Sequence, residues 1–404
     1  MQKFEKHSPV VVTEVTTKHE LRQFMQYPNR LYADNPNYIP SFYGDDLSDW
    51  TPGKNPAFDY CEARCWLARR DGEIVGRIGA ILSHKANDKF GTHRMRFSQV
   101  DFVDDSEVSA ALFGTVERWA REKGCDQVHG PLGFTDMDRE GMLVEGFDRR
   151  SLFFTNYNAP YYLEHLTRLG YRKDVDWIEY RITVPEPGGA EAERLHKLSE
   201  FILKRKHLHV ATVHHKSEYG PFVRQVFELV NAAYAPLYGV VELSDEQIER
   251  YANKFIPLVD PDFVCFVVDE QDQLVAFGVT ALDPSVALKH SDGRLFPFGW
   301  AGVLNDLHHS DTLIMLLTAV RPDLQAEGIN AVMMDHVCQS CNRHGVRFAE
   351  TGPMLELNDH ILAQWKRLEK EQHKRRRCFI KDLDHDVNAA NAAAAAAAEA
   401  ESAQ

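Results

Sequence analysis

Two stretches of the chain have the pattern of a β-hairpin, in which a short polar segment separates two apolar runs. Residues 66–82 (WLARRDGEIVGRIGAIL) and 264–282 (VCFVVDEQDQLVAFGVTAL) each hold an apolar strand, a polar turn and a second strand of small and β-branched residues. The two stretches lie about 200 residues apart in a chain of 404. This spacing predicts a duplicated domain.

The surroundings of the hairpins recur as well. Residues 94–103 read as a strand, 106–124 as a helix and 125–130 as a strand, and they follow the first hairpin. The second hairpin is followed by the continuous apolar strand TLIMLLTAV, a helix over 329–344 and the strand VRFAETG. The alternation predicts an α/β fold (α+β in part) with mixed sheets, in two tandem domains.

A helix is also expected before each hairpin. Residues 19–34 have helical periodicity, which we expect to stop at Pro28. Residues 243–260 read as a helix with Ser244 as its N-cap.

A linker is predicted between the halves, because Val184–Glu193 carries two prolines and two glycines. We expect an N-terminal domain over residues 1–184, a linker over 185–193 and a C-terminal domain over 194–385. The alanine-rich tail, 386–404, is of low complexity and is not expected to contribute to a core.

The composition narrows the function classes. Lys and Arg number 46 against 60 Asp and Glu, a net charge of −14 that argues against nucleic acid as a partner. No apolar run approaches the ~20 residues that span a bilayer, and the N-terminus lacks the apolar core of a secretion signal. The seven cysteines form no disulfide framework. We expect a cytoplasmic protein.

Metal catalysis is not expected. The adjacent histidine pairs His214–His215 and His308–His309 would face opposite sides of a strand, and no metal-binding motif joins them.

The loop after TLIMLLTAV is the most informative chemical segment. It holds Gln325-Ala326-Glu327-Gly328-Ile329-Asn330 between a buried strand and a helix. A glycine allows close backbone approach, and the free N–H groups of a helix N-terminus favour anions, so the segment predicts a pyrophosphate cradle. The first half has Asp104 and Asp105 at the equivalent place and no glycine. Those carboxylates would repel phosphate, so only the second half is expected to bind it.

This loop resembles the coenzyme A loop of the GNAT acyltransferases, Gln/Arg-x-x-Gly-x-Gly/Ala, with Gln325, Gly328 and Asn330 at its three key places. Residues 130–148 (GPLGFTDMDREGMLVEGFD) and 155–182, with RLYADNPNYIPSFYGDD and Gly76-Arg77, resemble a family of tandem-GNAT bacterial N-acyltransferases. That family includes the YghO-like proteins and the bacterial ceramide synthases. The resemblance covers nearly the whole chain. It implies transfer of a fatty acyl group from acyl-coenzyme A to the amine of a sphingoid base, in sphingolipid biosynthesis.

The resemblance also implies roles in the second half. Backbone N–H groups near the end of the fourth strand would hold the thioester oxygen, and the loop would hold the coenzyme A phosphates. The residues concerned are Thr318, Ala319, Val320, Arg321, Gln325, Ala326, Glu327, Gly328, Ile329 and Asn330.

A base is sought just past the fifth strand, in AETGPMLELNDH. Glu356 and Asn358 are two apart and point the same way in an extended stretch, so Asn358 is suited to orient the amine or the pantetheine amide. We predict Glu356 as the base, with Glu350 second.

Four acids crowd GFTDMDREGMLVEGF in the first half: Asp136, Asp138, Glu140 and Glu145. They are suited to receive a cationic amine, and a solvated acidic loop is the open alternative. The acceptor-side candidates are Phe134, Asp136, Glu140, Glu145 and Tyr157.

The run Lys366–Lys381 has eight basic and two acidic residues. Such a run is typical of a solvated helix face. Contact with nucleotide phosphates or with an anionic inner membrane, as a peripheral protein, is the alternative.

Three other functions stay open: an N-acyltransferase for a small amine or amino acid, a Fem-like aminoacyl transferase, and a non-catalytic GNAT pair. The acidic charge argues against tRNA. The departure of Asn330 from the small residue of the loop pattern leaves the non-catalytic function open.

Overall fold

The computed structural model describes residues 8–383, and the predicted alanine-rich tail lies outside the described residues. The first half builds strands and helices in the predicted order, here with their bounds: β1 (Val11–Glu14), α1 (Lys18–Leu31), α2 (Tyr43–Asp49), β2 (Cys61–Arg70), β3 (Glu73–Ser83), α3 (His84–Phe90), β4 (Arg94–Phe102), α4 (Ser106–Glu122), β5 (Gln127–Gly130), β6 (Met142–Glu145), α5 (Tyr161–Arg168) and β7 (Arg172–Thr183).

The second half repeats that succession and confirms the mixed α/β class. Its elements are α6 (Ala190–Lys206), β8 (His209–Val210), α7 (Gly220–Tyr234), α8 (Asp245–Phe255), β9 (Val264–Val268), β10 (Leu274–Leu282), α9 (Ser285–His290), α10 (Gly299–His309), β11 (Thr312–Val320), α11 (Asn330–His344), β12 (Phe348–Glu350), β13 (Met354–Leu355), α12 (Asp359–Ala363) and β14 (Lys370–Asp382).

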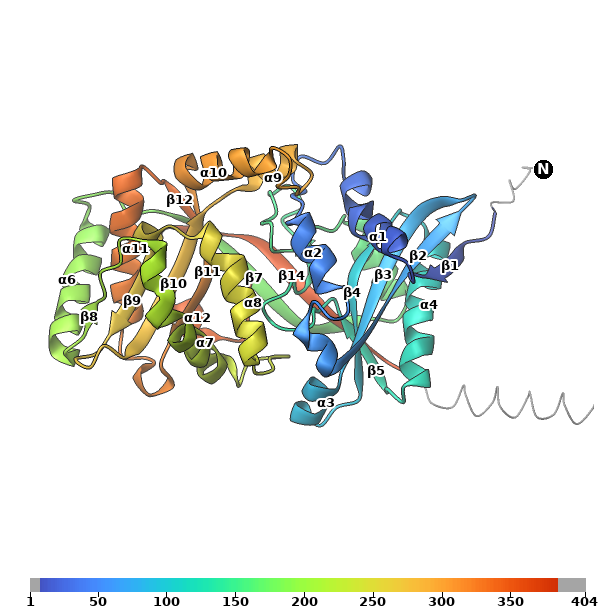
Figure 1. The fold of residues 1–404 in the computed structure, drawn as a ribbon, viewed down its shortest axis with the longest axis horizontal. Helices are drawn as coiled ribbons and strands as arrows, with labels where there is room; N and C mark the ends of the chain where they lie inside the picture. Colours follow the sequence, from blue (N-terminus) through green and yellow to red (C-terminus); the bar gives the residue numbers. More distant parts are fainter. Residues whose placement is uncertain (1–7, 384–404) are drawn as a thin grey trace, which may run out of the picture.

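One mixed sheet runs through both halves, in the order β1-β2-β3-β4-β5-β14-β7-β12-β11-β10-β9-β8. The last strand of each half crosses to the other: β14 pairs with β5 of the first half, and β7 pairs with β12 of the second. The two long strands also pair with each other, so they join the lobes in Figure 1. Because the halves exchange strands, the part of the sheet in each half is incomplete without a strand from the other half.

Each part of the sheet is covered on both faces, as strand periodicity requires. In β9, Val264, Phe266 and Val268 belong to the cluster under α7 and α8, whereas Cys265 and Val267 belong to the cluster under α6 and α11. Within residues 8–383, no helix combines the length and apolar composition that crossing a bilayer would take.

Helix α1 does not stop at Pro28 but continues to Leu31. A proline has no N–H for the carbonyl four residues earlier, which here is Phe24. That carbonyl oxygen instead accepts a hydrogen bond of 2.9 Å from Nη1 of the buried Arg77. Arg77 of β3 thus supplies the hydrogen bond to the Phe24 carbonyl that Pro28 cannot make, and the helix continues past the proline.

The basic run Lys366–Lys381 is not a helix face, since most of it is strand β14. Its cations are bonded inside the protein: Lys374 lies 3.2 Å from both Glu179 and Glu350, with its side chain fully buried. Arg376 is buried as well and pairs with Glu179. The cations of this run are therefore largely paired with carboxylates, mainly on β7, and form no free cationic patch among the described residues.

Candidate active site

The sheet opens in the middle of the second half. Strands β11 and β12 pair in parallel only where Thr312–Ile314 faces Phe348–Glu350. Beyond Ile314, β11 keeps its partner β10 while its other edge is unpaired, and β10 and β11 lose register by one residue at Val279. Side chains in the middle of β11 are half-exposed although those at its ends are buried. The structure thus presents an open strand edge.

Thr318 presents its peptide group to this edge. Its carbonyl oxygen accepts a hydrogen bond of 2.7 Å from the hydroxyl of Tyr234, on α7, rather than from β10. Because the N–H and C=O of one residue in an antiparallel strand face the same side, the Thr318 N–H also faces the open edge. Burial raises the pKa of Tyr234, which keeps the hydroxyl protonated.

The loop from Arg321 to Asn330 follows directly and leads into α11, whose 15 residues end at His344 with Gly345 as the C-cap. Gly328 has φ of 84°, and a Cβ there would lie 3.0 Å from Cδ1 of Ile202. This position requires glycine both for its backbone conformation and for its contact with α6.

The loop fits a phosphate group. Among the described residues, no acceptor within hydrogen-bond distance is present for the N–H groups of Ala326, Gly328, Ile329 and Asn330. Glu327, the acid next to Gly328, is paired with Lys206 at 2.6 Å, and that pairing lowers its pKa. Unpaired donors and a neutralised carboxylate make the surroundings suitable for an anion.

The first half has no such cradle. The Asp105 side chain caps α4 by accepting from the N–H of Glu107 and Val108, and it also pairs with Arg70. The helix N-terminus is therefore already occupied by a carboxylate of the chain, as the acids at this place predict.

A cavity of about 240 Å³ lies beside the open edge of β11. Leu316 and Leu317 of β11 line it, as do Gly352 and Pro353 after β12. Trp177 and Phe154 of the first half also line the cavity. The rest of the wall is mainly apolar and comes from α7, α8, β9 and neighbouring segments of the second half: Tyr219, Val223, Val226, Phe227, Tyr234, Ala252, Phe255, Ile256, Val259, Val264, Phe266 and Val279.

Three carboxyl groups enter this apolar cavity from the loop between β5 and β6: Asp136, Asp138 and Glu140. Burial, and then the charge of Asp138, raises the pKa of Asp136 to about 6. Burial and the charge of Asp49 raise the pKa of Asp138 to about 6. Burial, with Asp136 next to it, holds the pKa of Glu140 well above its usual range. Such groups can take up a proton near neutral pH and attract a cation.

Glu140 and Asp136 accept no hydrogen bond from another residue among residues 8–383, whereas Asp138 is held in place. Its Oδ2 accepts from the N–H of Phe134 at 2.8 Å, and its Oδ1 accepts from the Tyr251 hydroxyl at 3.3 Å. Since Tyr251 belongs to α8, the acidic loop of the first half is fastened to the wall of the cavity.

The predicted base lies elsewhere. Glu356 is not among the cavity residues and is paired with Lys173 and with Arg375, the latter at 2.7 Å. Burial alone would raise the pKa of Glu356, but the two cations outweigh it and lower the pKa. A carboxylate held by two cations accepts a proton poorly, so the geometry favours the cavity acids as bases.

The companions of Glu356 are also engaged in the fold. Asn358 caps α12 by accepting from the N–H of Ile361 at 3.3 Å. Glu350 is mostly buried and pairs with Lys374. Neither lines the cavity.

The other acceptor-side candidates are dispersed. Phe134 is buried with its ring 5.1 Å from that of Trp50, in the core of the first half. Glu145 is exposed and pairs with Arg375. Tyr157 is buried and accepts a hydrogen bond from Asn35. Of the five candidates, the structure brings Asp136 and Glu140 together in the cavity.

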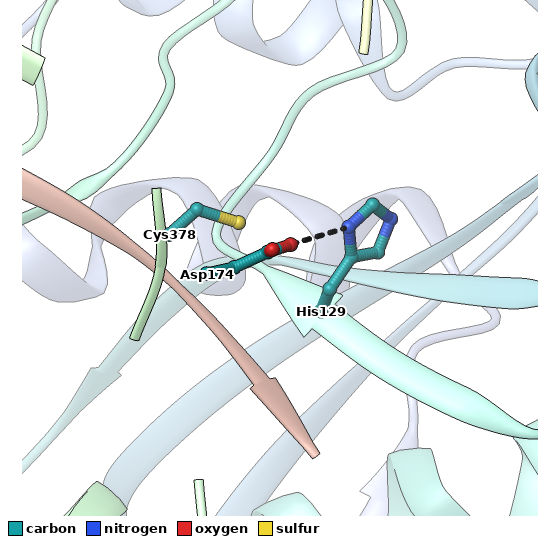
Figure 2. A group of neighbouring side chains, drawn as sticks. All are labelled: His129, Asp174 and Cys378. Atoms are coloured by element: carbon teal, nitrogen blue, oxygen red, sulfur yellow. Dashed lines mark ion pairs between the residues drawn. The ribbon is translucent and has the colours of Figure 1, made fainter. Parts of the chain in front are cut away.

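A second polar group lies where the halves meet. Figure 2 shows His129 of β5, Asp174 of β7 and Cys378 of β14 turned toward one another. Each offers a polar atom, and these atoms lie within 4.8 Å of one another. The Tyr238 hydroxyl donates to Asp174 at 2.5 Å and lies 3.0 Å from His129 Nδ1 and 3.5 Å from Cys378 Sγ. Burial, with Arg96 nearby, holds the pKa of His129 well below its usual range. The group thus anchors the tyrosine that follows α7.

Comparison with known proteins identifies this architecture. A tandem GNAT protein from the clavulanic acid biosynthesis pathway superposes with a TM-score of 0.53 at 14% identity, covering 93% of this chain and 99% of that one. A GCN5-related glucosamine N-acetyltransferase region of a fungal β-N-acetylglucosaminidase also gives 0.53, at 11% identity, covering 93% of this chain and 38% of that one. The chain has the tandem GNAT fold.

Sequence relatives narrow the class, although no family model matches the chain. The chain is 27% identical over 379 residues to Protein YghO of Escherichia coli K12, covering 92% of this chain and 95% of YghO. It is 28% identical over 300 residues to the bacterial ceramide synthase of Caulobacter vibrioides, covering 72% and 75%. The chain is thus similar in sequence to YghO over nearly its whole length and to a bacterial ceramide synthase over most of it.

Sequence reasoning missed Tyr234, Tyr251 and the other cavity residues of α7 and α8. The apolar periodicity of α7 signals a buried face, but a face that lines a cavity and a face that packs have the same pattern.

Proposed function

We propose that this protein is an acyl-coenzyme A-dependent N-acyltransferase that moves a fatty acyl group to the amine of a long-chain base, of which a sphingoid base is the preferred example. The observation that carries the proposal is the apolar cavity beside the open edge of β11, with three carboxyl groups at its polar side. A cationic head with a hydrocarbon tail matches that combination of surfaces. The ceramide synthase relative supports the same chemistry.

Coenzyme A is a co-substrate in this scheme. The unpaired N–H groups of Ala326, Gly328, Ile329 and Asn330 would hold its phosphates, and the pantetheine arm would lie in the gap between β11 and β12. The Thr318 N–H would donate to the thioester oxygen as negative charge develops there.

The reaction itself is a direct aminolysis. Glu140 takes a proton from the bound ammonium, and the free amine attacks the thioester carbon. The tetrahedral intermediate collapses to an amide as the C–S bond breaks, and the leaving thiolate receives a proton from the Tyr234 hydroxyl. The second proton that the attacking nitrogen loses passes to the Tyr234 oxygen and restores the hydroxyl, so the two protons of the former ammonium end on Glu140 and on the thiol. Asp136 and Asp138 hold the cationic head before it is deprotonated.

The small-amine alternative receives less support, because a small acceptor would leave the apolar wall of the cavity unused. An aminoacyl-tRNA donor is disfavoured because phosphates would meet three carboxyl groups at the acceptor side.

The donor half of the proposal is tested by thermal stabilisation with coenzyme A, acetyl-coenzyme A and palmitoyl-coenzyme A. We expect all three to raise the unfolding temperature, with palmitoyl-coenzyme A raising it most beyond a detergent control. Equal shifts would point to a short acyl donor. No shift from any of them would contradict the proposal.

A further inference from the structure

The turn between α9 and α10 carries the two most exposed phenylalanines of the described residues, and the first turn of α10 adds an exposed tryptophan. Phe296 is 80% exposed, Phe298 82% and Trp300 47%. The turn is not a loose tip, since Trp300 Nε1 donates to the Pro297 carbonyl at 3.2 Å. Contiguous exposed apolar groups of this size mark an interaction surface rather than ordinary surface composition.

Helix α10 is apolar on two sides. Its inner side, Val303 and Leu307, is buried in a cluster with α9. Its outer side presents Leu304, 45% exposed, next to Trp300, and α9 adds Val286 at 49%. The inner contacts suffice to hold the helix, so the outer apolar residues are not needed for folding. We call Val286, Phe296, Phe298, Trp300 and Leu304 the aromatic ridge.

The charge around the aromatic ridge differs from that of the whole chain. Between Asp292 and Asp306 no further acid occurs, and Arg294 is the one charged residue of that stretch. Arg294, His290, His308 and His309 are exposed beside the ridge, as are Asp292 at its edge and the neutral Asn305. In a chain of net charge −14, an aromatic surface with so few acids is suited to an anionic interface.

We propose that the aromatic ridge inserts into the interfacial region of an anionic lipid bilayer. Phenylalanine and tryptophan at an exposed turn, beside a helix with an outer apolar side, have the chemistry of peripheral membrane attachment. Helices α9 and α10 lie along one edge of the molecule (Figure 1), and α10 packs against β10.

The ridge is also connected to the cavity through packing. Leu295, in the turn, belongs to the same apolar cluster as Phe154 and Leu316, which line the cavity wall. Attachment would therefore hold the cavity side of the second half next to the membrane. The aromatic ridge, and not the basic run of β14, would then be the surface that contacts lipid.

The test is co-sedimentation of the full chain with sucrose-loaded vesicles, without acyl-coenzyme A or amine, so the result does not depend on the proposed reaction. Vesicles of phosphatidylcholine alone are compared with vesicles containing phosphatidylglycerol. We expect stronger binding to the anionic vesicles, and a loss of about tenfold or more in the partition coefficient for the F296S/F298S/W300S variant.

The matched control is F201S/L357S, which removes apolar residues that are 57% and 79% exposed on other surfaces. It should bind like the unmodified chain. Equal binding by the ridge variant would overturn the proposal. So would absence of vesicle binding combined with a dimer in sedimentation velocity that the ridge variant loses, because the ridge would then contact a second copy.

Discussion

Glu140 combines three properties of a general base: it lines the cavity, accepts no hydrogen bond from another described residue, and has a raised pKa. We predict that Glu140→Gln lowers kcat about 100-fold or more. The raised pKa means that ionisation of Glu140 destabilises the folded state, so the variant should also melt at a higher temperature than the unmodified chain at pH 8. Steady-state assays and calorimetry measure the two effects.

Glu356→Gln is the matched control for that variant. Loss of its charge leaves Lys173 and Arg375 without a full partner, so stability should fall while kcat changes less than about threefold. If Glu356→Gln abolishes turnover and Glu140→Gln does not, the base is the residue that the sequence predicts.

The carboxyl groups of the cavity also predict how kcat/KM depends on pH. Asp136 and Asp138 have pKa values raised to about 6, so both lose their protons as pH rises through that value. Because the ionised forms hold the ammonium, kcat/KM should rise over the same range, and the apparent pKa belongs to the whole group of acids. Asp136→Asn should change this limb of the profile. A rate independent of pH between 5 and 8 would contradict the assignment.

Gly328 tests the phosphate loop. Gly328→Ala should raise KM for acyl-coenzyme A about tenfold or more, since alanine is strained at φ of 84° and its Cβ meets Ile202. Gly345→Ala is the control, because Gly345 ends the same helix at φ of 72° with open space around it. It should cost similar stability but leave KM unchanged; an equal rise in KM for both would show a general effect of the helix.

At the scale of elements, a helix, strand or loop could be predicted where the residues that define it are neighbours in the sequence. The strand β11, the loop at Gly328 and the helix α11 were predictable because apolar runs and a glycine are local features. The pairing of β14 with β5 was not, since a strand whose alternate positions are Lys374, Arg376 and Cys378 has no apolar alternation. The cavity acids were named as candidates, but only packing against α8 distinguishes them from a solvated loop.

The buried ion pair between β14 and β7 provides a test of how much the exchanged strands contribute to stability. Arg376 and Glu179 have fully buried side chains, and Arg376 with Lys374 lowers the pKa of Glu179 to about 2 although burial alone would raise it. Arg376→Met should cost roughly 3–5 kcal/mol of unfolding free energy, measured with urea. Arg367→Met, exposed in the same basic run, should cost less than about 0.5 kcal/mol. Equal costs would mean that the buried pair contributes nothing.

At the scale of the molecule, two similar halves have different tasks. The first half closes its helix N-terminus with Asp105 and extends an acidic loop into the cavity of the second, which keeps the open strand edge and the phosphate loop. The exchanged strands β7 and β14 hold the two parts in register. Residues of both halves thus line the cavity, and we predict that neither half catalyses alone.

The most direct test of this account is to incubate the full chain with palmitoyl-coenzyme A and a long-chain base such as sphinganine. The amide is measured by mass spectrometry and the released thiol by a colorimetric reagent. We predict one thiol released per amide formed, and neither product above background with Glu140→Gln. Thiol release without amide, or amide formed equally well from acetyl-coenzyme A and a small amine, would contradict the central claim.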